Sequence, residues 1–124
     1  MWDRFTERAK RVILLAEEEA GHLGQKYVST EHLLLGLIAD RNCVAVHILD
    51  QLGVGPGRIR SEIERQAARG DDREDAKRQL TPRAKRVIDF AHLEARQLNN
   101  HYIGTEHLLL GLLRVDEALG ARAR

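Results

Sequence analysis

The sequence predicts an all-α protein, folded as a pseudo-twofold helical bundle of two tandem repeats. Aromatic residues make up only 4% and Pro occurs twice, whereas 43% of the residues are hydrophobic, a balance typical of helices built on aliphatic side chains. Residues 5–38 align without a gap on residues 80–113, and 20 of the 34 aligned pairs are identical. A chain of 124 residues leaves no room for a second large core. Both copies should therefore share one domain, and a surface site in one copy should have a twin.

The duplication divides the single domain, residues 1–124, into repeat one at 1–68, an exposed linker at 69–79 and repeat two at 80–124. The linker is strongly polar and has no apolar stripe. Repeat two is shortened at its C-terminal end, because repeat one continues for two more predicted helices. We therefore expect part of the apolar surface of repeat two to lack an intramolecular cover and to favour self-association.

The first helix of each repeat follows from apolar residues at helical spacing. Six positions in repeat one recur in repeat two and form matching buried stripes: Ala9, Val12, Ile13, Ala16, Ala20 and Leu23, with Ala84, Val87, Ile88, Ala91, Ala95 and Leu98. Thr6 and Thr81 stand where an N-cap hydroxyl accepts from unpaired backbone N–H groups. Pro82 fits the first helical position, where its missing donor costs nothing.

The shorter helices are read from caps and stop signals. Residues 30–38 predict a second, Leu-rich helix capped by Thr30, and the stretch from Thr105 mirrors it. A third helix covers 43–51 and ends before Gly53, and a fourth starts at Pro56. Repeat one is therefore predicted to contain four helices.

Charge and motif content exclude several functions. Twenty Lys and Arg against 19 Asp and Glu give a net charge of +1, so the surface is mixed in sign, and we expect no nucleic-acid partner. No apolar run reaches the roughly 18 residues of a membrane span, so no membrane role is expected. The single Cys43 cannot form an internal disulfide, which favours the cytoplasm. No phosphate-binding loop, dinucleotide fingerprint or nucleophile elbow is present, so we expect neither an enzyme nor a cofactor.

Metal binding is the strongest catalytic alternative, because Glu31-His32 and Glu106-His107 duplicate a carboxylate beside an imidazole. Di-iron bundles use Glu-x-x-His, which puts both ligands on one helix face, whereas adjacent residues point roughly 100° apart. Packing or helix-start roles for these histidines are therefore favoured. No metal is expected, and a metalloenzyme is kept only as a third hypothesis.

The duplicated Glu31 and Glu106 have two interpretations. Each lies in the first turn of a predicted helix, where a carboxylate stabilises the helix dipole by about 0.3–1 kcal/mol. Alternatively, each binds a guanidinium, whose planar donors match two carboxylate oxygens. If the helix starts at Thr6 and Thr81 lie nearby, their N–H groups would suit an attached phosphate. The basic clusters from Arg8 and from Arg83 are read mainly as solvated helix faces.

Three motifs resemble a known family: the opening FTERAKRV from Phe5, the start LTPRAKRVI of repeat two, and the box YxxTEHLLLGL from Tyr27 and again from Tyr102. The chain resembles the N-terminal domain of Clp-type AAA+ unfoldases of the ClpC class, over nearly its whole length. The resemblance implies two tandem Clp-N repeats that receive protein substrates and adaptor proteins for a Clp AAA+ ring and its protease. Such a domain hydrolyses nothing itself, and a larger parent protein would be the ATPase.

The resemblance also implies site residues. In ClpC-like members each repeat holds a phosphorylated arginine as a degradation tag. Glu31 and Glu106 would bind the guanidinium, and the phosphate would lie near Thr6 and Arg8 in one copy and near Thr81 and Arg83 in the other. A surface for adaptors or cyclic peptides would include Lys10, Lys85 and Tyr102.

The chain also departs from the family pattern. Ser29 replaces the usual Gly before TEH, whereas Gly104 keeps it, so the first pocket is expected to differ. A Gly-Glu-Gly-rich turn after the second helix is replaced by residues 40–43 in copy one and 115–118 in copy two. The ATPase modules are absent. An alternative to a domain serving a Clp unfoldase is thus a stand-alone regulator or decoy that competes for its ligands or toxins.

Overall fold

The computed structural model describes residues 2–67, 69–71 and 77–123, with side chains described up to Val115. Within these ranges the chain forms six helices and no strand, which confirms the predicted all-α class. Repeat one provides α1 (Glu7–His22), α2 (Thr30–Ala39), α3 (Val44–Gln51) and α4 (Pro56–Gln66), and repeat two provides α5 (Pro82–Gln97) and α6 (Thr105–Ala123). Residues 72–76 of the predicted linker lie outside the described part.

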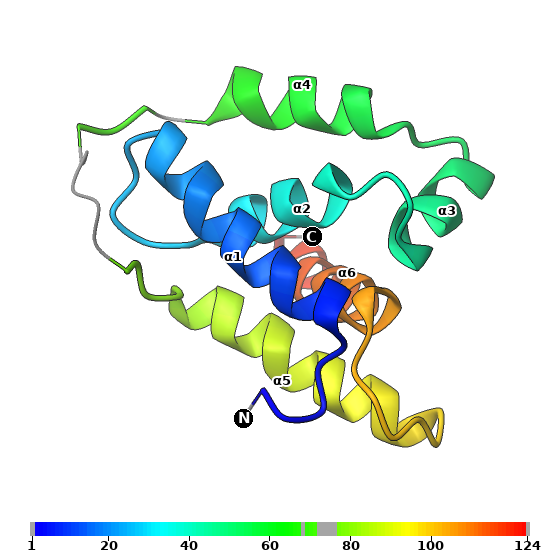
Figure 1. Ribbon diagram of the computed structural model, residues 1–124. Helices are drawn as coiled ribbons and strands as arrows, with labels where there is room; N and C mark the ends of the chain where they lie inside the picture. The colour runs from blue at the N-terminus through cyan, green and yellow to red at the C-terminus, as the bar shows by residue number, and fades with distance from the viewer. Residues whose placement is uncertain (1, 68, 72–76, 124) are drawn as a thin grey trace.

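Each repeat contributes one tightly packed helix pair, α1 with α2 and α5 with α6. Helix α4 lies across α2 on the outside of repeat one, and α3 packs against α6, so it joins the two repeats (Figure 1). Of the described helices, none alone is long and apolar enough to cross a membrane. Only α2 and α3 taken together meet the length and composition required, and they are bent by 94°.

Close contact within each pair depends on a glycine in the Leu-rich helix. A Cβ at Gly36 would lie 2.5 Å from the carbonyl oxygen of Val12 and 3.0 Å from the amide nitrogen of Ala16. A Cβ at Gly111 would meet the carbonyl oxygen of Val87 at the same place in repeat two. Since backbone oxygen cannot rotate away as a side chain does, both positions require the absence of a side chain.

The main core is shared by both repeats. Its buried residues include five of the six predicted stripe positions of each first helix together with Leu33, Leu37, Leu108 and Leu112 from the Leu-rich helices. The sixth position, Leu23 in repeat one, lies in a smaller cluster. The prediction that its counterpart Leu98 is buried is wrong, because Leu98 follows α5 and is 55% exposed, with no described helix in the place that α4 takes over Leu23. A second, smaller cluster of Leu23, Leu35 and Ile38 is covered by Ile59 and Ile63 of α4. Repeat one therefore buries both faces of α2.

The first helix of each repeat starts at its predicted cap, but α2 and α6 do not, because Thr30 and Thr105 are both already helical. The hydroxyl oxygens of Thr6 and Thr81 accept from the backbone N–H groups of Ala9 and Ala84, each at 3.1 Å. The prediction that Thr30 caps α2 is wrong by one residue, because Thr30 is already helical and Ser29 is the N-cap.

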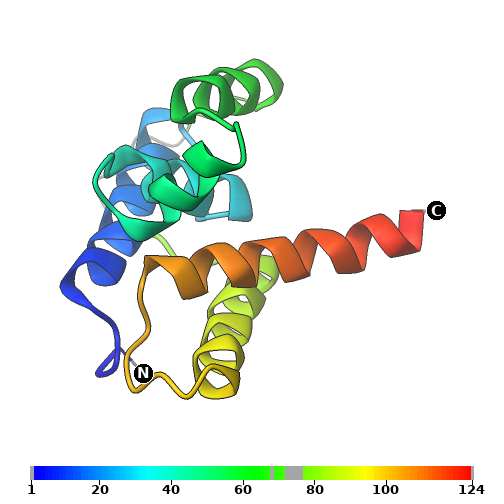
Figure 2. The same ribbon diagram turned by 90° about the vertical axis from the view of Figure 1, so that its right-hand side faces the viewer.

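The two repeats differ where α2 ends. Helix α2 stops at Ala39, and the following Asp40 accepts the backbone N–H of Asn42 at 3.1 Å, which turns the chain toward α3. The counterpart of Asp40 is Val115, which is buried inside α6. Because Val115 and the following Glu117, Ala118 and Leu119 offer no turn signal and include good helix formers, α6 continues to Ala123 and extends away from the bundle (Figure 2).

Candidate functional site

The two predicted glutamate sites are each assembled from both repeats. Phe5 pairs with Ile103 and Leu80 pairs with Val28, each as a single parallel bridge. The Thr6 N–H donates to Ile103 O at 3.0 Å, and the Thr81 N–H donates to Val28 O at 2.9 Å. The start of α1 thus lies beside the segment that leads into α6, and the start of α5 lies beside the segment that leads into α2.

Site one is a cavity of about 340 Å³ that contains Glu31 and, from the other repeat, Thr81. The remaining lining residues come from the α1–α2 connection, the start of α2 and the end of α4: Gln25, Lys26, Tyr27, Ser29, His32 and Ala67. Its charged lining consists of the Glu31 carboxylate and the Lys26 ammonium, and the latter lies over the Tyr27 ring at 5.8 Å from its centre. The cavity therefore offers one negative and one positive side chain in its lining.

The two glutamates are held in different ways. The hydroxyl of Ser29 donates to Glu31 Oε2 at 3.2 Å. In repeat two the Tyr102 hydroxyl donates to Glu106 Oε2 at 3.2 Å, and Glu106 Oε1 lies in the space that a Cβ on Gly104 would fill. The charge of Glu106, with this hydrogen bond, raises the pKa of Tyr102. The twin sites are thus related by the duplication but are not equivalent.

His32 and His107, which follow the two glutamates, accept hydrogen bonds from the residues just before α2 and α6. The Ser29 N–H donates to His32 Nδ1 and the Gly104 N–H donates to His107 Nδ1, both at 2.9 Å. An acceptor Nδ1 carries no proton, so each ring is neutral with its hydrogen on Nε2, and His107 Nε2 lies 2.8 Å from Asn100 Oδ1. The described residues contain no group of three or more His, Cys, Asp or Glu arranged to hold a metal ion. A helix-start role accounts for both histidines.

Protonation of His32 should weaken the fold. Burial lowers the pKa of His32 below its usual 6.5, so its contribution to stability is complete above about pH 6.5 and is lost as the pH falls toward the folded-state pKa. We expect His32→Gln, which keeps an acceptor at this position, to lose less unfolding free energy between about pH 7.5 and 5.5 than the wild type. Urea denaturation at both pH values measures this. His47→Gln, at an exposed position, is the control, and equal losses in both variants would contradict the assignment.

The predicted phosphate and adaptor residues lie in several places. Thr6 and Thr81 are at the cross-repeat contacts described above. Arg8 is ion-paired with Asp40 at 2.6 Å and faces a separate groove, whereas Arg83 is partly buried on α5. Lys10 and Lys85 are exposed on α1 and α5, and Lys10 pairs with Glu7 at 3.4 Å. Tyr102, predicted only as part of an adaptor surface, contacts Glu106.

Sequence reasoning missed Lys26 and Asp40. Lys26 has no identical counterpart, because His101 stands there, but its place next to the duplicated Tyr was visible in the alignment. Asp40 pairs with a residue 32 positions away in the sequence, and its counterpart is an apolar Val. No local pattern could indicate that pair.

An apolar groove follows the outer side of α1. Its volume is about 670 Å³, and its lining combines aliphatic and aromatic surface with two lysines: Trp2, Lys10, Ile13, Leu14, Glu17 and Lys77. Leu14 is 61% exposed and Trp2 is 36% exposed. Exposed apolar side chains gathered along one helix typically mark a protein contact surface.

A second apolar surface lies on repeat two, where α4 has no counterpart in the described chain. Leu98 is 55% and Leu113 51% exposed, whereas their counterparts Leu23 and Ile38 are 5% and 2% exposed beneath α4. In repeat one Arg60 of α4 pairs with Glu19, and in repeat two Arg114 of α6 itself pairs with Glu94 at 3.2 Å. In repeat two the Glu94 carboxylate is thus paired within the repeat, by Arg114, while Leu98 and Leu113 stay exposed.

Comparison with known families and sequences gives consistent matches. The family described as the Clp repeat (R) N-terminal domain matches residues 4–123. The chloroplastic chaperone protein ClpC of Pisum sativum is 48% identical over 122 residues, which are 98% of this chain and 13% of that protein. The ClpA homolog of Guillardia theta, an ATP-dependent Clp protease ATP-binding subunit, is also 48% identical, over 98% of this chain and 15% of its own length. The chain thus spans a small part of these relatives.

Solved structures share the fold. The N-terminal domain of ClpD from Arabidopsis thaliana superposes with a TM-score of 0.73 at 30% identity, over 98% of this chain and 83% of that one. The N-domain of ClpV from Vibrio cholerae reaches a TM-score of 0.80 at 16% identity, over 92% and 69%. A ClpV N-domain in complex with a VipB peptide gives 0.76 at 16% identity, over 90% and 68%. At 16% identity the likeness concerns the fold alone.

Proposed function

Since the chain belongs to the Clp repeat (R) N-terminal domain family, we propose that it is a non-catalytic protein-recognition domain that presents substrates and adaptor proteins to a Clp AAA+ unfoldase and its protease. The observation that carries this proposal is the Glu31 cavity, which is lined from both repeats, together with the matching contact that places Thr6 beside the segment leading to Glu106. One of the larger relatives, the ClpA homolog of Guillardia theta, is named as an ATP-binding subunit, so ATP hydrolysis would belong to other parts of such proteins.

The ligand that fits these sites is a phosphorylated arginine side chain. Its guanidinium matches the Glu31 carboxylate, since planar N–H donors meet two carboxylate oxygens. Its phosphate matches Lys26 and the start of α5, where the Thr81 oxygen accepts the Ala84 N–H and its own hydroxyl proton remains available to donate. The N-terminus of α5 also favours an anion, because backbone N–H groups and the positive end of the helix dipole lie there. In site two, Glu106 and Thr6 take the corresponding roles.

Calorimetry with phosphoarginine tests this proposal on four proteins: wild type, Glu31→Ala, Glu106→Ala and the double variant. We expect two binding events in the wild type, one in each single variant and none in the double variant, because each change removes the carboxylate proposed to receive that guanidinium. Loss of one partner of a charged hydrogen-bonded pair weakens binding by about 2–5 kcal/mol.

Glu62→Ala is the matched control, since it removes one carboxylate from the exposed face of α4. Unmodified arginine and inorganic phosphate, titrated separately, show whether both halves of the ligand are needed. Equal heats from the wild type and the double variant would refute the phosphoarginine assignment but leave a more general role in protein recognition open to other ligands.

We further propose that adaptors bind the outer groove of α1, which Lys10 lines together with Trp2 and Glu17, with Lys85 and Tyr102 on repeat two as further contacts. The ClpV N-domain, which shares this fold, was solved with a VipB peptide, so the fold is one on which a peptide can bind. The uncovered leucines of repeat two, Leu98 and Leu113, provide a surface for self-association. A rise of average mass with concentration in sedimentation experiments would support that contact.

A further inference from the structure

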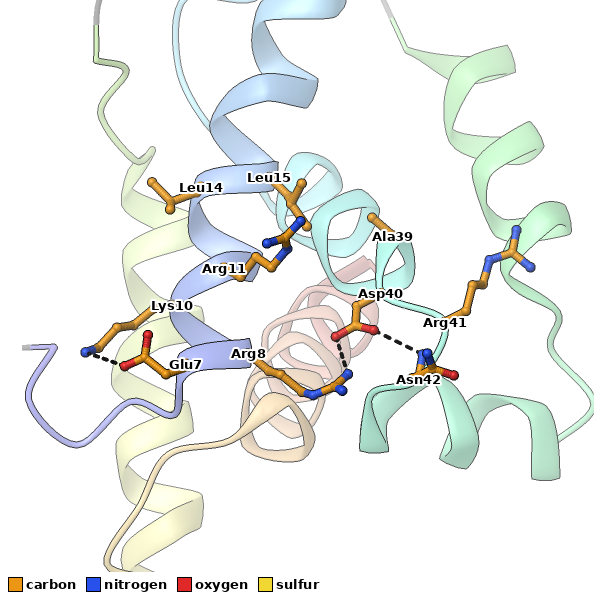
Figure 3. Close-up of a pocket in the computed structure, with 10 residues that line it drawn as sticks. All are labelled: Glu7, Arg8, Lys10, Arg11, Leu14, Leu15, Ala39, Asp40, Arg41 and Asn42. Carbon is orange, nitrogen blue, oxygen red and sulfur yellow. Dashed lines mark hydrogen bonds and ion pairs between the residues drawn. The ribbon is translucent and has the colours of Figure 1, made fainter.

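A groove of about 830 Å³ separates the first turns of α1 from the connection between α2 and α3 (Figure 3). Its lining comes from these two segments only: Glu7, Arg8, Lys10, Arg11, Leu14, Leu15, Ala39, Asp40, Arg41 and Asn42. It contains none of the residues that line the Glu31 cavity. The groove is therefore separate from the Glu31 site, although it shares Lys10 and Leu14 with the outer groove of α1.

The charge of the groove is predominantly positive, with four cationic and two anionic side chains. Asp40 is already neutralised, because its Oδ2 receives Arg8 Nη1 at 2.6 Å and its Oδ1 accepts the Asn42 N–H at 3.1 Å. Among the described residues no ion pair reaches Arg11 or Arg41, and both are exposed on the rim. The groove thus offers two guanidinium groups to an incoming anion.

Between these cations lies apolar surface. Leu15 is partly buried beside Arg11 and Ala39 is exposed at the end of α2, whereas Leu14 lies on the other side of α1 (Figure 3). Guanidinium groups beside aliphatic side chains match a peptide that carries carboxylates next to an aliphatic residue.

The groove has no twin, which sets it apart from the duplicated glutamate sites. In repeat two the counterpart of Asp40 is the buried Val115, inside an uninterrupted α6. The counterparts of Leu15 and Ala39 are Phe90 and Arg114, and the Arg114 guanidinium lies over the Phe90 ring at 4.6 Å from its centre. Repeat two therefore lacks both the connecting turn and the apolar floor, although it keeps Arg86 as the counterpart of Arg11.

We propose that the groove between α1 and the α2–α3 connection binds a short acidic peptide segment of a protein partner, with an aliphatic side chain against Leu15 and Ala39 and carboxylates on Arg11 and Arg41. The proposal rests on the proposed role in protein recognition but does not involve phosphoarginine. Only repeat one would bind such an acidic peptide.

Fluorescence anisotropy with a labelled short peptide of alternating Glu and Leu tests the proposal, with Gln-for-Glu and Lys-for-Glu peptides as comparisons. We expect the acidic peptide to bind most tightly, and Arg11→Glu/Arg41→Glu to weaken its binding about tenfold, as reversal of two rim charges predicts. The charge-matched control is Arg58→Glu/Arg86→Glu, at exposed positions on α4 and α5, which should bind like the wild type.

Two results would overturn the proposal: equal weakening by both double variants, which indicates a general charge effect, or equal affinity for the Glu and Gln peptides. The Glu31→Ala/Glu106→Ala protein separates this site from the twin sites. If that protein binds the acidic peptide normally while phosphoarginine gives no heat with the wild type, only the phosphoarginine proposal fails. If it loses the peptide, the peptide binds at the glutamate sites and the groove assignment is wrong.

Discussion

Alanine at Gly36 or Gly111 is expected to lower the free energy of unfolding by about 1–3 kcal/mol each, which is the usual cost of forcing atoms into a packed contact. The new Cβ at Gly36 would lie 2.5 Å from Val12 O and 3.0 Å from Ala16 N, so α1 and α2 would have to separate. Alanine gains about 1 kcal/mol of helix propensity over glycine, but this gain does not offset displacement of a whole helix. Denaturant unfolding of each variant and of the double variant measures the effect.

Gly57→Ala is the matched control, since it makes the same change inside α4, where a new Cβ meets nothing within 4 Å. This variant should be unchanged or more stable by up to about 1 kcal/mol. If Gly36→Ala and Gly57→Ala had the same effect, the close crossing of α1 and α2 would not be a determinant of the fold.

Serine at Gly104 is expected to weaken phosphoarginine binding at site two by about tenfold, or about 1.4 kcal/mol, while the protein stays folded. The new Cβ would occupy the space of Glu106 Oε1, and a flexible carboxylate moves aside at little cost in stability. The backbone tolerates serine there, because Ser29 occupies the equivalent position of repeat one with the same hydrogen bond to a histidine.

The pKa of Tyr102 gives an independent readout of that displacement. The charge of Glu106 raises this pKa, so Gly104→Ser should lower it toward its usual value as the carboxylate leaves the hydroxyl. Absorbance titration in a Tyr27→Phe background, which leaves Tyr102 as the single tyrosine, isolates the signal. An unchanged Tyr102 pKa together with unchanged affinity would show that Gly104 does not position Glu106.

Most of the fold could be predicted from local signals. The stripes of α1 and α5, the hydroxyl caps at Thr6 and Thr81 and the Pro56 start of α4 all depend on residues within a few turns, and the duplication repeats the first two of these. Leu98 is the exception, because its burial would require a covering helix like α4 and not a local pattern. The Thr30 cap was misplaced by one residue because Ser29 and Thr30 are both good capping residues, and the bond between the Ser29 N–H and His32 decides between them.

The candidate site was only partly predictable. The alignment identifies Glu31 and Glu106 as equivalent, but it contains no information on which copy supplies the neighbouring threonine. That depends on how the segments before the helices pair. Val28, which precedes α2, pairs with Leu80, which precedes α5, and these two residues lie far apart in sequence. The pair of Arg8 with Asp40 was hidden for the same reason.

The central claim is that each glutamate site is built from both repeats. Amide NMR spectra recorded during a phosphoarginine titration test it most directly. The expected result is two groups of shifted signals, one joining the Glu31 region to Thr81 and Ala84 and the other joining the Glu106 region to Thr6 and Ala9. Shifts that join the Glu31 region to Thr6 but leave Thr81 unmoved, or an unchanged spectrum at saturating ligand, would contradict it.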